Sequence, residues 1–194
     1  MKIVGLTGGI GSGKTTAANM FKEMGAPVYF ADVEAKKLTN TSKIIRRKLI
    51  QLLGKEAYVN NELNRKFVAS KIFKDANLLQ EVNTIIHPKV AKHFARWVKK
   101  QNAPYCIKEA AILFESGSYQ QCDVTVLVTA PREVRIKRVM QRDDTSKKAV
   151  LDRMEHQWSD ERKKEMADFV IENTTLDALK EQIIALDKKL SEVP

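Results

Sequence analysis

The stretch Gly8-Gly9-Ile10-Gly11-Ser12-Gly13-Lys14-Thr15 decides the fold, because it matches the phosphate-loop pattern G-x-x-x-x-G-K-[ST] at every fixed position. Glycines in such a loop let backbone N–H groups close around phosphate oxygens, since no Cβ stands between them. The lysine reaches the β- and γ-phosphates, and the threonine hydroxyl binds Mg²⁺. We therefore predict that nucleotide phosphates bind to Gly9, Gly11, Ser12, Gly13, Lys14, Thr15 and Thr16.

The segments on both sides of this loop have the pattern that the loop requires. An apolar run at residues 3–7 predicts a strand, and the amphipathic residues 14–24 predict a helix that ends at Gly25. A second apolar run at 28–31 predicts another strand, which leads into Asp32. Strand, loop, helix and strand in this order form the first unit of a parallel α/β sheet.

Only helical patterns follow from Asp32 to about Lys100. The predicted helices are 32–39, 42–53, 66–73, 75–84 and 87–99, with loops near Gly54 and at Asn60-Asn61. Pro88 fits the first turn of the last of these helices. The stretch is too long for a simple crossover between strands, so we expect a helical lobe of its own.

Strand patterns return in the second half of the chain. Buried parallel strands are predicted at 105–108 and 124–128, and a last strand at 169–171. The helices predicted around them are 131–142, 146–157, 159–166 and 177–190. The predicted fold class is therefore α/β, a P-loop NTPase-type parallel sheet flanked by helices.

The charge is distributed unevenly along the chain, whose net charge is +10. Residues 1–97 carry 17 lysines and arginines against seven acidic residues, whereas residues 98–194 carry 17 of each. Such asymmetry points to a polyanionic partner, either nucleic acid or a phosphorylated small molecule. Aromatic residues make up only 7% of the chain, and no RNA-binding signature is visible, so we expect no nucleic-acid partner.

Composition also excludes several classes of protein. With only Cys106 and Cys122, the chain is neither a disulfide scaffold nor a cysteine-ligated zinc protein. The first residues run straight into glycines rather than into a signal peptide, and no apolar stretch approaches the length of a membrane span. We expect a soluble, cytoplasmic protein with no membrane partner.

Two acidic residues end predicted strands where ligands collect in open α/β sheets. Asp32 follows the second strand, where it could accept a proton from a substrate hydroxyl or help to hold Mg²⁺. The other interpretation is an N-cap for a helix that starts at Val33. Glu109 ends the third strand and is a candidate either for indirect support of a metal ion or for a structural ion pair. Glu115 fits a structural ion pair better than a catalytic role.

Arginines recur on one face of the helix predicted after the fourth strand. Arg135, Arg138 and Arg142 are spaced by three and four residues, and guanidinium groups are suited to clamping phosphoryl oxygens. The other interpretation is a solvated face that pairs with the acids Glu133, Asp143 and Asp144. The phosphate loop in the same chain favours the phosphoryl role.

An ordered series of motifs over nearly the whole chain resembles the dephospho-CoA kinase family. The series comprises Gly5 to Thr15, Ala31-Asp32, Leu63-Asn64-Arg65, His87-Pro88, Ile112-Leu113-Phe114-Glu115, Arg138 to Asp143, Gln157, and Asp168 to Asn173. The chain departs from the family where Phe30 replaces an aspartate, Ala111 replaces a proline and Glu109 replaces an aspartate.

The resemblance implies an ATP-dependent, Mg²⁺-requiring kinase that phosphorylates the ribose 3′-hydroxyl of dephospho-CoA. It implies a core at about 1–31, 100–132 and 167–194, a helical CoA-binding insertion at about 32–99, and a lid at about 133–166, all within a single domain. By resemblance the catalytic residues are Asp32 as general base, Lys14 and Arg138. Arg142 would bind ATP from the lid side, and Arg65 and His87 would bind the acceptor.

Two other functions remain open from the residues alone. One is a kinase of the same architecture that acts on a nucleotide or nucleoside. The other is a nucleic-acid-linked P-loop ATPase that uses the basic lobe, which would show salt-dependent binding to an oligonucleotide.

Overall fold

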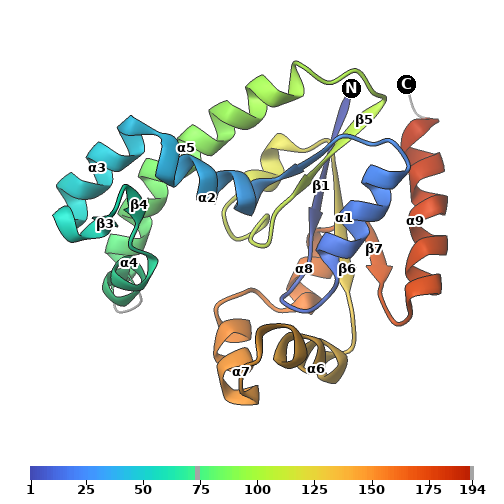
Figure 1. Ribbon diagram of the computed structural model, residues 1–194. Helices are drawn as coiled ribbons and strands as arrows, with labels where there is room; N and C mark the ends of the chain where they lie inside the picture. The colour runs from blue at the N-terminus through green and yellow to red at the C-terminus, as the bar shows by residue number, and fades with distance from the viewer. Residues whose placement is uncertain (73–74, 193–194) are drawn as a thin grey trace. The chain divides into compact units, whose positions relative to one another are not determined.

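The computed structural model describes residues 1–72 and 75–192. It contains two compact units (Figure 1). The first consists of Met1–Phe30 together with the chain from Gln101 onward, and the second consists of Ala31–Lys100.

The first unit is built on a five-stranded sheet in which every described pair of neighbours is parallel. Its strands are β1 (Lys2–Thr7), β2 (Val28–Phe30), β5 (Tyr105–Glu109), β6 (Val124–Thr129) and β7 (Phe169–Glu172). Their order across the sheet is β2-β5-β1-β6-β7, which puts β1 in the centre. All five strands were predicted from apolar runs, and the α/β class is confirmed.

Helices follow the strands of this unit as the sequence predicts. They are α1 (Lys14–Glu23), α6 (Arg132–Asp143), α7 (Lys147–Glu155), α8 (Asp160–Met166) and α9 (Leu176–Ser191). Helices α1 and α9 lie side by side against the sheet (Figure 1). There Phe21 of α1 and Ile183 of α9 join Leu6 of β1 in the core, and all three are nearly or fully buried. Burial of each such side chain stabilises the fold by about 1.5–3 kcal/mol.

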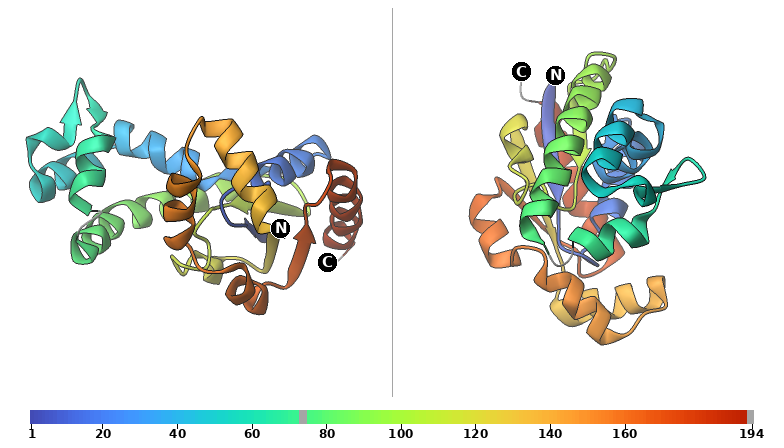
Figure 2. Two further views of the ribbon diagram at one scale, coloured as in Figure 1. Left: turned by 90° about the horizontal axis from the view of Figure 1, so that it is seen from below. Right: turned by 90° about the vertical axis from the view of Figure 1, so that its left-hand side faces the viewer.

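Three consecutive helices separate β6 from β7, seen in brown and orange in Figure 2. The hydroxyls of Ser146 and Ser159 cap the N-termini of α7 and α8 by accepting backbone N–H bonds. Buried Ile136, Val139 and Val150 pack together between α6 and α7. This small apolar cluster lets the segment hold its own shape beside the sheet.

Strand β7 lies at one edge of the sheet, and α9 covers part of that edge. The side chain of Gln182 in α9 accepts a hydrogen bond from the N–H of Glu172 and donates one to its carbonyl, both at 3.0 Å. Both backbone hydrogen-bonding groups of the last strand residue are thereby satisfied.

The second unit is mainly helical and has its own apolar core. Its elements are α2 (Ala31–Thr41), α3 (Lys43–Leu53), a 3-10 turn (Lys55–Ala57), β3 (Tyr58–Val59), β4 (Glu62–Leu63), α4 (Arg65–Ile72) and α5 (Ala76–Val98). The core contains Ile45, Leu49, Val68 and Val82. The predicted helix 66–73 corresponds to α4, and residue 73 lies outside the described residues.

The prediction of separate helices at 75–84 and 87–99 was wrong. Helix α5 runs without a break from Ala76 to Val98, and Pro88 lies inside it. A proline inside a helix costs about 3 kcal/mol. Val82 before it and Phe94 after it are both buried, and these contacts favour one continuous helix.

The prediction of only helical structure in this region was also wrong, because β3 and β4 form an antiparallel hairpin. The hairpin stands out from the helices of the second unit in Figure 2. Its turn residues Asn60 and Asn61 have φ of 51° and 69°, a conformation that asparagine tolerates well. Arg46 of α3 fixes the hairpin, because its guanidinium lies over the Tyr58 ring and donates a 2.8 Å hydrogen bond to Asn61.

Candidate active site

The phosphate loop joins β1 to α1 and adopts the tight backbone that its glycines permit. Gly11 and Gly13 have φ of +79° and +91°, and the Ser12 N–H bonds to the Gly9 carbonyl at 3.0 Å. A Cβ on Gly11 would stand 2.5 Å from the backbone oxygen of Arg135. The loop therefore requires glycine at this position for space as well as for conformation.

Helix α1 begins directly after this loop, and its N-terminus remains open to an anion. Gly13 at the N-cap provides no side-chain cap, and no acidic residue stands in the first turn. N–H groups at such an end attract phosphate through hydrogen bonds and the helix dipole. Thr15 and Thr16 lie exposed in the same turn, as the loop pattern requires of a phosphate and metal site.

Lys14, Thr15 and Glu109 come together at the end of the sheet. Lys14 Nζ lies 2.6 Å from Oε1 of Glu109, and the Thr15 hydroxyl donates a 3.3 Å hydrogen bond to the same oxygen. Glu109 reaches them because β5 is the neighbour of β1, and parallel strands end at the same edge. A carboxylate and a hydroxyl beside one another supply the oxygen ligands that Mg²⁺ prefers.

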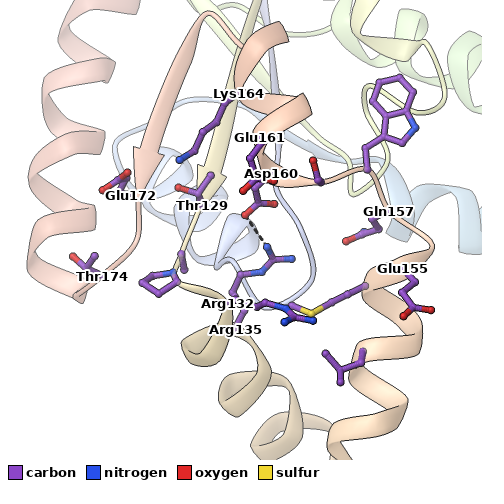
Figure 3. Close-up of a pocket in the computed structure, with 16 residues that line it drawn as sticks. Thr129, Arg132, Arg135, Glu155, Gln157, Asp160, Glu161, Lys164, Glu172 and Thr174 are labelled. Carbon is purple, nitrogen blue, oxygen red and sulfur yellow. Dashed lines mark hydrogen bonds and ion pairs between the residues drawn. The ribbon is translucent and has the colours of Figure 1, made fainter.

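Arg135 holds the phosphate loop in place. Its Nε donates a 2.9 Å hydrogen bond to the Ile10 carbonyl, and Nη1 lies 2.7 Å from Asp160. Figure 3 shows Arg135 and Asp160 joined at the wall of a pocket of about 580 Å³ formed by residues of α6, α7, α8 and the ends of β6 and β7. A Cβ on Gly9 would collide with this guanidinium at 2.1 Å.

Two further side chains support the loop, and sequence reasoning gave neither a role. Gln157 Oε1 accepts a 2.9 Å hydrogen bond from the Ile10 N–H. Asn173, buried after β7, donates a 2.8 Å hydrogen bond to the Ser12 carbonyl. Both residues belong to the series of family motifs, and that series was the signal in the sequence that could have identified them. Their partners lie 147 and 161 positions away, so spacing could not reveal the contacts.

Arg138 lies on the same helix as Arg135 but has weaker protein contacts. Its Nη2 lies 3.4 Å from the Asn173 carbonyl and 3.5 Å from its side-chain oxygen. Its buried Nη1 has no hydrogen-bond partner among the described residues. A buried guanidinium nitrogen without a partner is costly, so Arg138 is suited to receive an anionic oxygen.

Arg142 is placed differently from the other two arginines. It forms two hydrogen bonds with Asp143, at 2.7 and 3.0 Å, and its side chain is 61% exposed. Arg153 also binds Asp143, and the hydrogen bonds from both arginines hold the pKa of the Asp143 carboxyl well below its usual range. Arg142 thus pairs with Asp143, one of the acids expected as partners if the arginines form a solvated face.

Glu115 forms the structural ion pair that we expected. It lies 2.8 Å from Nζ of Lys163, whose side chain is completely buried. The same carboxylate oxygen accepts a 3.1 Å hydrogen bond from the Trp158 N–H. Glu115 thereby connects the loop after β5 to the segment just before α8 and to the middle of that helix.

Asp32, Arg65 and His87 belong to the second unit. Helix α2 begins at Ala31, so Asp32 lies inside its first turn, and the interpretation as an N-cap before Val33 was wrong. The apolar strand that leads into it stops at Phe30, which leaves Ala31 to the helix. His87 lies within α5, where desolvation lowers the pKa of its imidazole although the residue is exposed overall.

Arg65, the first residue of α4, lines a cleft of about 280 Å³ within the second unit. Side chains from α2, β4, α4 and α5 form its walls. Most of these walls are aliphatic, and Lys36 supplies a second cation. The structure therefore brings one of the predicted acceptor residues to a cavity.

The described helices include none that is both long and apolar enough to cross a membrane. The described residues also contain no cluster of three or more His, Cys, Asp or Glu side chains that could hold a metal ion.

Comparison with known proteins gives a consistent result. A family model described as dephospho-CoA kinase matches residues 2–178. The dephospho-CoA kinase of Bacteroides fragilis is 40% identical over 184 residues, which cover 94% of this chain and 90% of that protein. The dephospho-CoA kinase of Porphyromonas gingivalis is 39% identical over 178 residues, which cover 92% and 87% of the two chains.

Solved structures share the fold of this chain. A structure from Thermus thermophilus has 33% identity and a TM-score of 0.89, and the match covers 100% of this chain and 98% of the other. The dephospho-CoA kinase of Campylobacter jejuni shares the fold at 23% identity and a TM-score of 0.71, covering 98% and 97%. Given the family model over almost its full length and relatives near 40% identity, the chain belongs to the dephospho-CoA kinase family.

Proposed function

We propose that this protein transfers the γ-phosphoryl group of ATP to the ribose 3′-hydroxyl of dephospho-CoA, which gives CoA and ADP. The observation that carries the proposal is the cluster of Lys14, Thr15 and Glu109 at the phosphate loop, in a chain of this family. In the proposed reaction Lys14 and the loop amides neutralise charge that develops on the β- and γ-phosphates.

Mg²⁺ fits the oxygen donors of this cluster, with Thr15 as ligand and Glu109 as indirect support. When bound, the ion would neutralise charge on the phosphates. Thr15 would offer its hydroxyl oxygen, and Glu109, which is only 3% exposed, would keep Lys14 and Thr15 oriented.

Asp32 is proposed as the general base that accepts the proton of the 3′-hydroxyl. The first turn of α2 is a favourable place for a carboxylate, because the helix dipole stabilises its charged form. A base of this kind contributes roughly 10²–10⁴-fold to the rate.

Arg138 is proposed as the arginine that stabilises the transferring group, and Arg142 as an ATP ligand. The buried, unpartnered Nη1 of Arg138 supports the first role. The second role requires Arg142 to exchange Asp143 for a phosphate oxygen. Closure of the segment at 133–166 would exclude water, which otherwise competes with the acceptor for the phosphoryl group.

The basic lobe is proposed as the acceptor-binding part, through Arg65 and His87. Residues 33–97 carry 14 lysines and arginines against five acidic residues, which would attract the diphosphate of dephospho-CoA. The partners of the protein are then ATP and dephospho-CoA, with neither nucleic acid nor a membrane, and we propose that the reaction takes place in the cytoplasm.

The test offers several acceptors in parallel to the purified protein with Mg²⁺-ATP: dephospho-CoA, AMP, CMP, adenosine and an oligonucleotide. We expect CoA formation to exceed every other reaction by orders of magnitude. A faster reaction with a nucleoside monophosphate would overturn the choice of acceptor. ATP hydrolysis stimulated only by the oligonucleotide would overturn the kinase function as well.

A further inference from the structure

Two carbonyl oxygens of the phosphate loop are held by side chains from outside the loop. Arg135 of α6 donates from its Nε to the Ile10 carbonyl at 2.9 Å. Asn173, which follows β7, donates from its side-chain amide to the Ser12 carbonyl at 2.8 Å. Both side chains belong to buried residues, with exposures of 8% and 4%. The two carbonyls therefore have fixed directions.

These directions also determine where two N–H groups of the loop point. In a planar trans peptide, the C=O of one residue and the N–H of the next point in opposite directions. The described residues contain no cis peptide bond. The N–H of Gly11 therefore points away from Arg135, and the N–H of Gly13 points away from Asn173. Neither N–H has a hydrogen-bond acceptor among the described residues.

The N–H groups between these two are already used within the protein. The Ile10 N–H donates to Gln157 at 2.9 Å, and the Ser12 N–H donates to the Gly9 carbonyl at 3.0 Å. Alternate N–H groups of the loop are thus satisfied internally, and those of Gly11 and Gly13 remain for a ligand. N–H groups that alternate in this way, next to a helix N-terminus, suit phosphate oxygens.

Asn173 stands directly against the loop and also reaches Arg138. A Cβ on Gly13 would collide with the side-chain amide nitrogen of Asn173. The carbonyl and the side-chain oxygen of Asn173 lie 3.4 and 3.5 Å from Nη2 of Arg138. The N–H of Asn173 bonds to the Thr129 carbonyl of β6 at 2.8 Å. Asn173 is therefore anchored to the sheet while it contacts both the loop and Arg138.

We propose that Arg135 and Asn173 are positioning residues for the nucleotide phosphates, which set the directions of the Gly11 and Gly13 N–H groups before the nucleotide binds. This inference rests on the proposed function and adds how its phosphate site is held ready. Donors that already point at the ligand stabilise its charge without reorganisation. Asn173 also fixes Arg138 beside the same loop, so one buried amide orients two groups of the proposed site.

The test follows the two amides separately by NMR, with Mg²⁺-ADP and inorganic pyrophosphate as probes. Asn173→Asp preserves the size of the side chain, but its carboxylate cannot donate to the Ser12 carbonyl. Arg135→Lys preserves the charge but lacks the planar, multiple donors of arginine. Gln182→Ala is the matched control, because it removes both side-chain bonds to Glu172 at the end of β7 and leaves the loop contacts in place.

We expect both amide protons to shift downfield when the wild type binds either probe. Asn173→Asp should lose most of the Gly13 shift and retain that of Gly11, and Arg135→Lys should show the reverse. Both variants should raise the Kd of pyrophosphate about tenfold or more, which corresponds to roughly 1.4 kcal/mol. The Kd of dephospho-CoA should change less than about twofold, and Gln182→Ala should resemble the wild type with both probes.

Thermal melting checks that each variant is folded, and Asn173→Ser, whose hydroxyl is too short to reach the Ser12 carbonyl, replaces Asn173→Asp if that variant is unstable. Unchanged shifts and affinities in folded variants would leave Arg135 and Asn173 with a structural role only. Equal loss of both shifts in each variant would mean that the loop loosens as a whole. An equal loss of affinity in Gln182→Ala would assign the effect of Asn173 to β7.

Each of these three results overturns the inference and leaves the kinase function intact. A wild type that shows both amide shifts, with the selective losses in the variants, but forms no CoA from dephospho-CoA would overturn the proposed function instead. In that case the positioning of the two amides would stand.

Discussion

Lys14 and Glu109 form a 2.6 Å ion pair at the end of the sheet, and only 4% of the Glu109 side chain is exposed. The lysine that we propose to bind phosphate thus also pairs with a buried carboxylate. If Lys14 turns to a phosphate, Thr15 would remain as a hydrogen-bond donor to the same Glu109 oxygen. The effects of substitutions at this pair therefore combine stability and catalysis, and the experiments must separate them.

Lys14→Ala should abolish most activity, with kcat and kcat/KM falling together by roughly 10²-fold or more, because a contact of the transition state is lost. It should also lower the free energy of unfolding by about 1–3 kcal/mol, since a buried carboxylate loses its partner. Steady-state rates and urea unfolding measure the two effects.

The double variant Lys14→Ala/Glu109→Gln provides the control for that experiment. Its neutral amide needs no counter-charge, so much of the lost stability should return while the activity stays low. A stable double variant with restored turnover would contradict the role of Lys14.

Asp32→Asn should retain ATP binding but lower the rate of transfer by roughly 10²-fold or more, because an amide cannot accept the proton. Glu34→Gln is the matched control, since Glu34 is the other acid in the first turn of α2. Both substitutions should cost a similar 0.3–1 kcal/mol or so of helix-dipole stabilisation. Similar rates for the two variants in single-turnover assays would show that Asp32 only stabilises the helix and does not act as the general base.

Arg135→Ala should mainly lower stability, whereas Arg138→Ala should mainly lower the rate of transfer. Arg135 bonds to Ile10 and Asp160, so its loss should lower the melting temperature and, through the loop, weaken ATP binding. Arg138 has an unpartnered buried nitrogen, so its removal should change the melting temperature little and lower kcat. Calorimetry together with kinetics distinguishes them, and a destabilised but fully active Arg138→Ala would show that our proposal is wrong.

Glu115→Gln should destabilise the protein by about 3–5 kcal/mol, because fully buried Lys163 loses its counter-ion. Adding Lys163→Met should recover most of this loss, since an apolar side chain of similar length replaces the buried cation. Urea unfolding of the single and double variants measures both. Equal stabilities of wild type and Glu115→Gln would exclude a structural role for the pair.

The two free cysteines should make the protein less stable in alkali. Burial raises the pKa of both the Cys106 and the Cys122 thiol to about 11. Thiols of the unfolded chain ionise near pH 8.5, so between about pH 8.5 and 11 the folded state keeps protons that the unfolded state has lost. The free energy of unfolding therefore falls as pH rises through this window.

Urea midpoints at pH 8 and pH 10.5 test this expectation against the variant Cys106→Ala/Cys122→Ala. The variant should lose less stability than the wild type between these pH values, since its unfolded chain releases no thiol protons. Identical losses would show that the buried thiols do not contribute. At pH 8 the folded wild type should also react slowly with iodoacetamide, because little thiolate is present.

Much of the fold and part of the site followed from the sequence, because the signals were local. Apolar runs located all five strands, and the phosphate-loop pattern located the turn between β1 and α1. Glu109 could be placed near the loop because the carboxyl ends of parallel strands meet at one edge.

The parts that sequence reasoning missed depend on distant contacts. The burial of Arg135 depends on Ile10 and Asp160, which lie 125 and 25 positions away. The continuity of α5 through Pro88 depends on the packing of Val82 and Phe94, which outweighs the local signal. The hairpin at Asn60-Asn61 had only two residues in each strand, too few for an alternating pattern.

The contact of Gln182 with Glu172 has a consequence for how copies of this protein behave in concentrated solution. An edge strand with unpaired N–H and C=O groups can recruit a strand from another molecule and start aggregation. Asn173 bonds back to β6, so the alternation along a strand turns Glu172 and Val170 outward. The Gln182 side chain bonds both the N–H and the carbonyl of Glu172, so Val170 is the only residue of β7 whose outward N–H and C=O could bond to another strand. A single residue is too short to dock a strand.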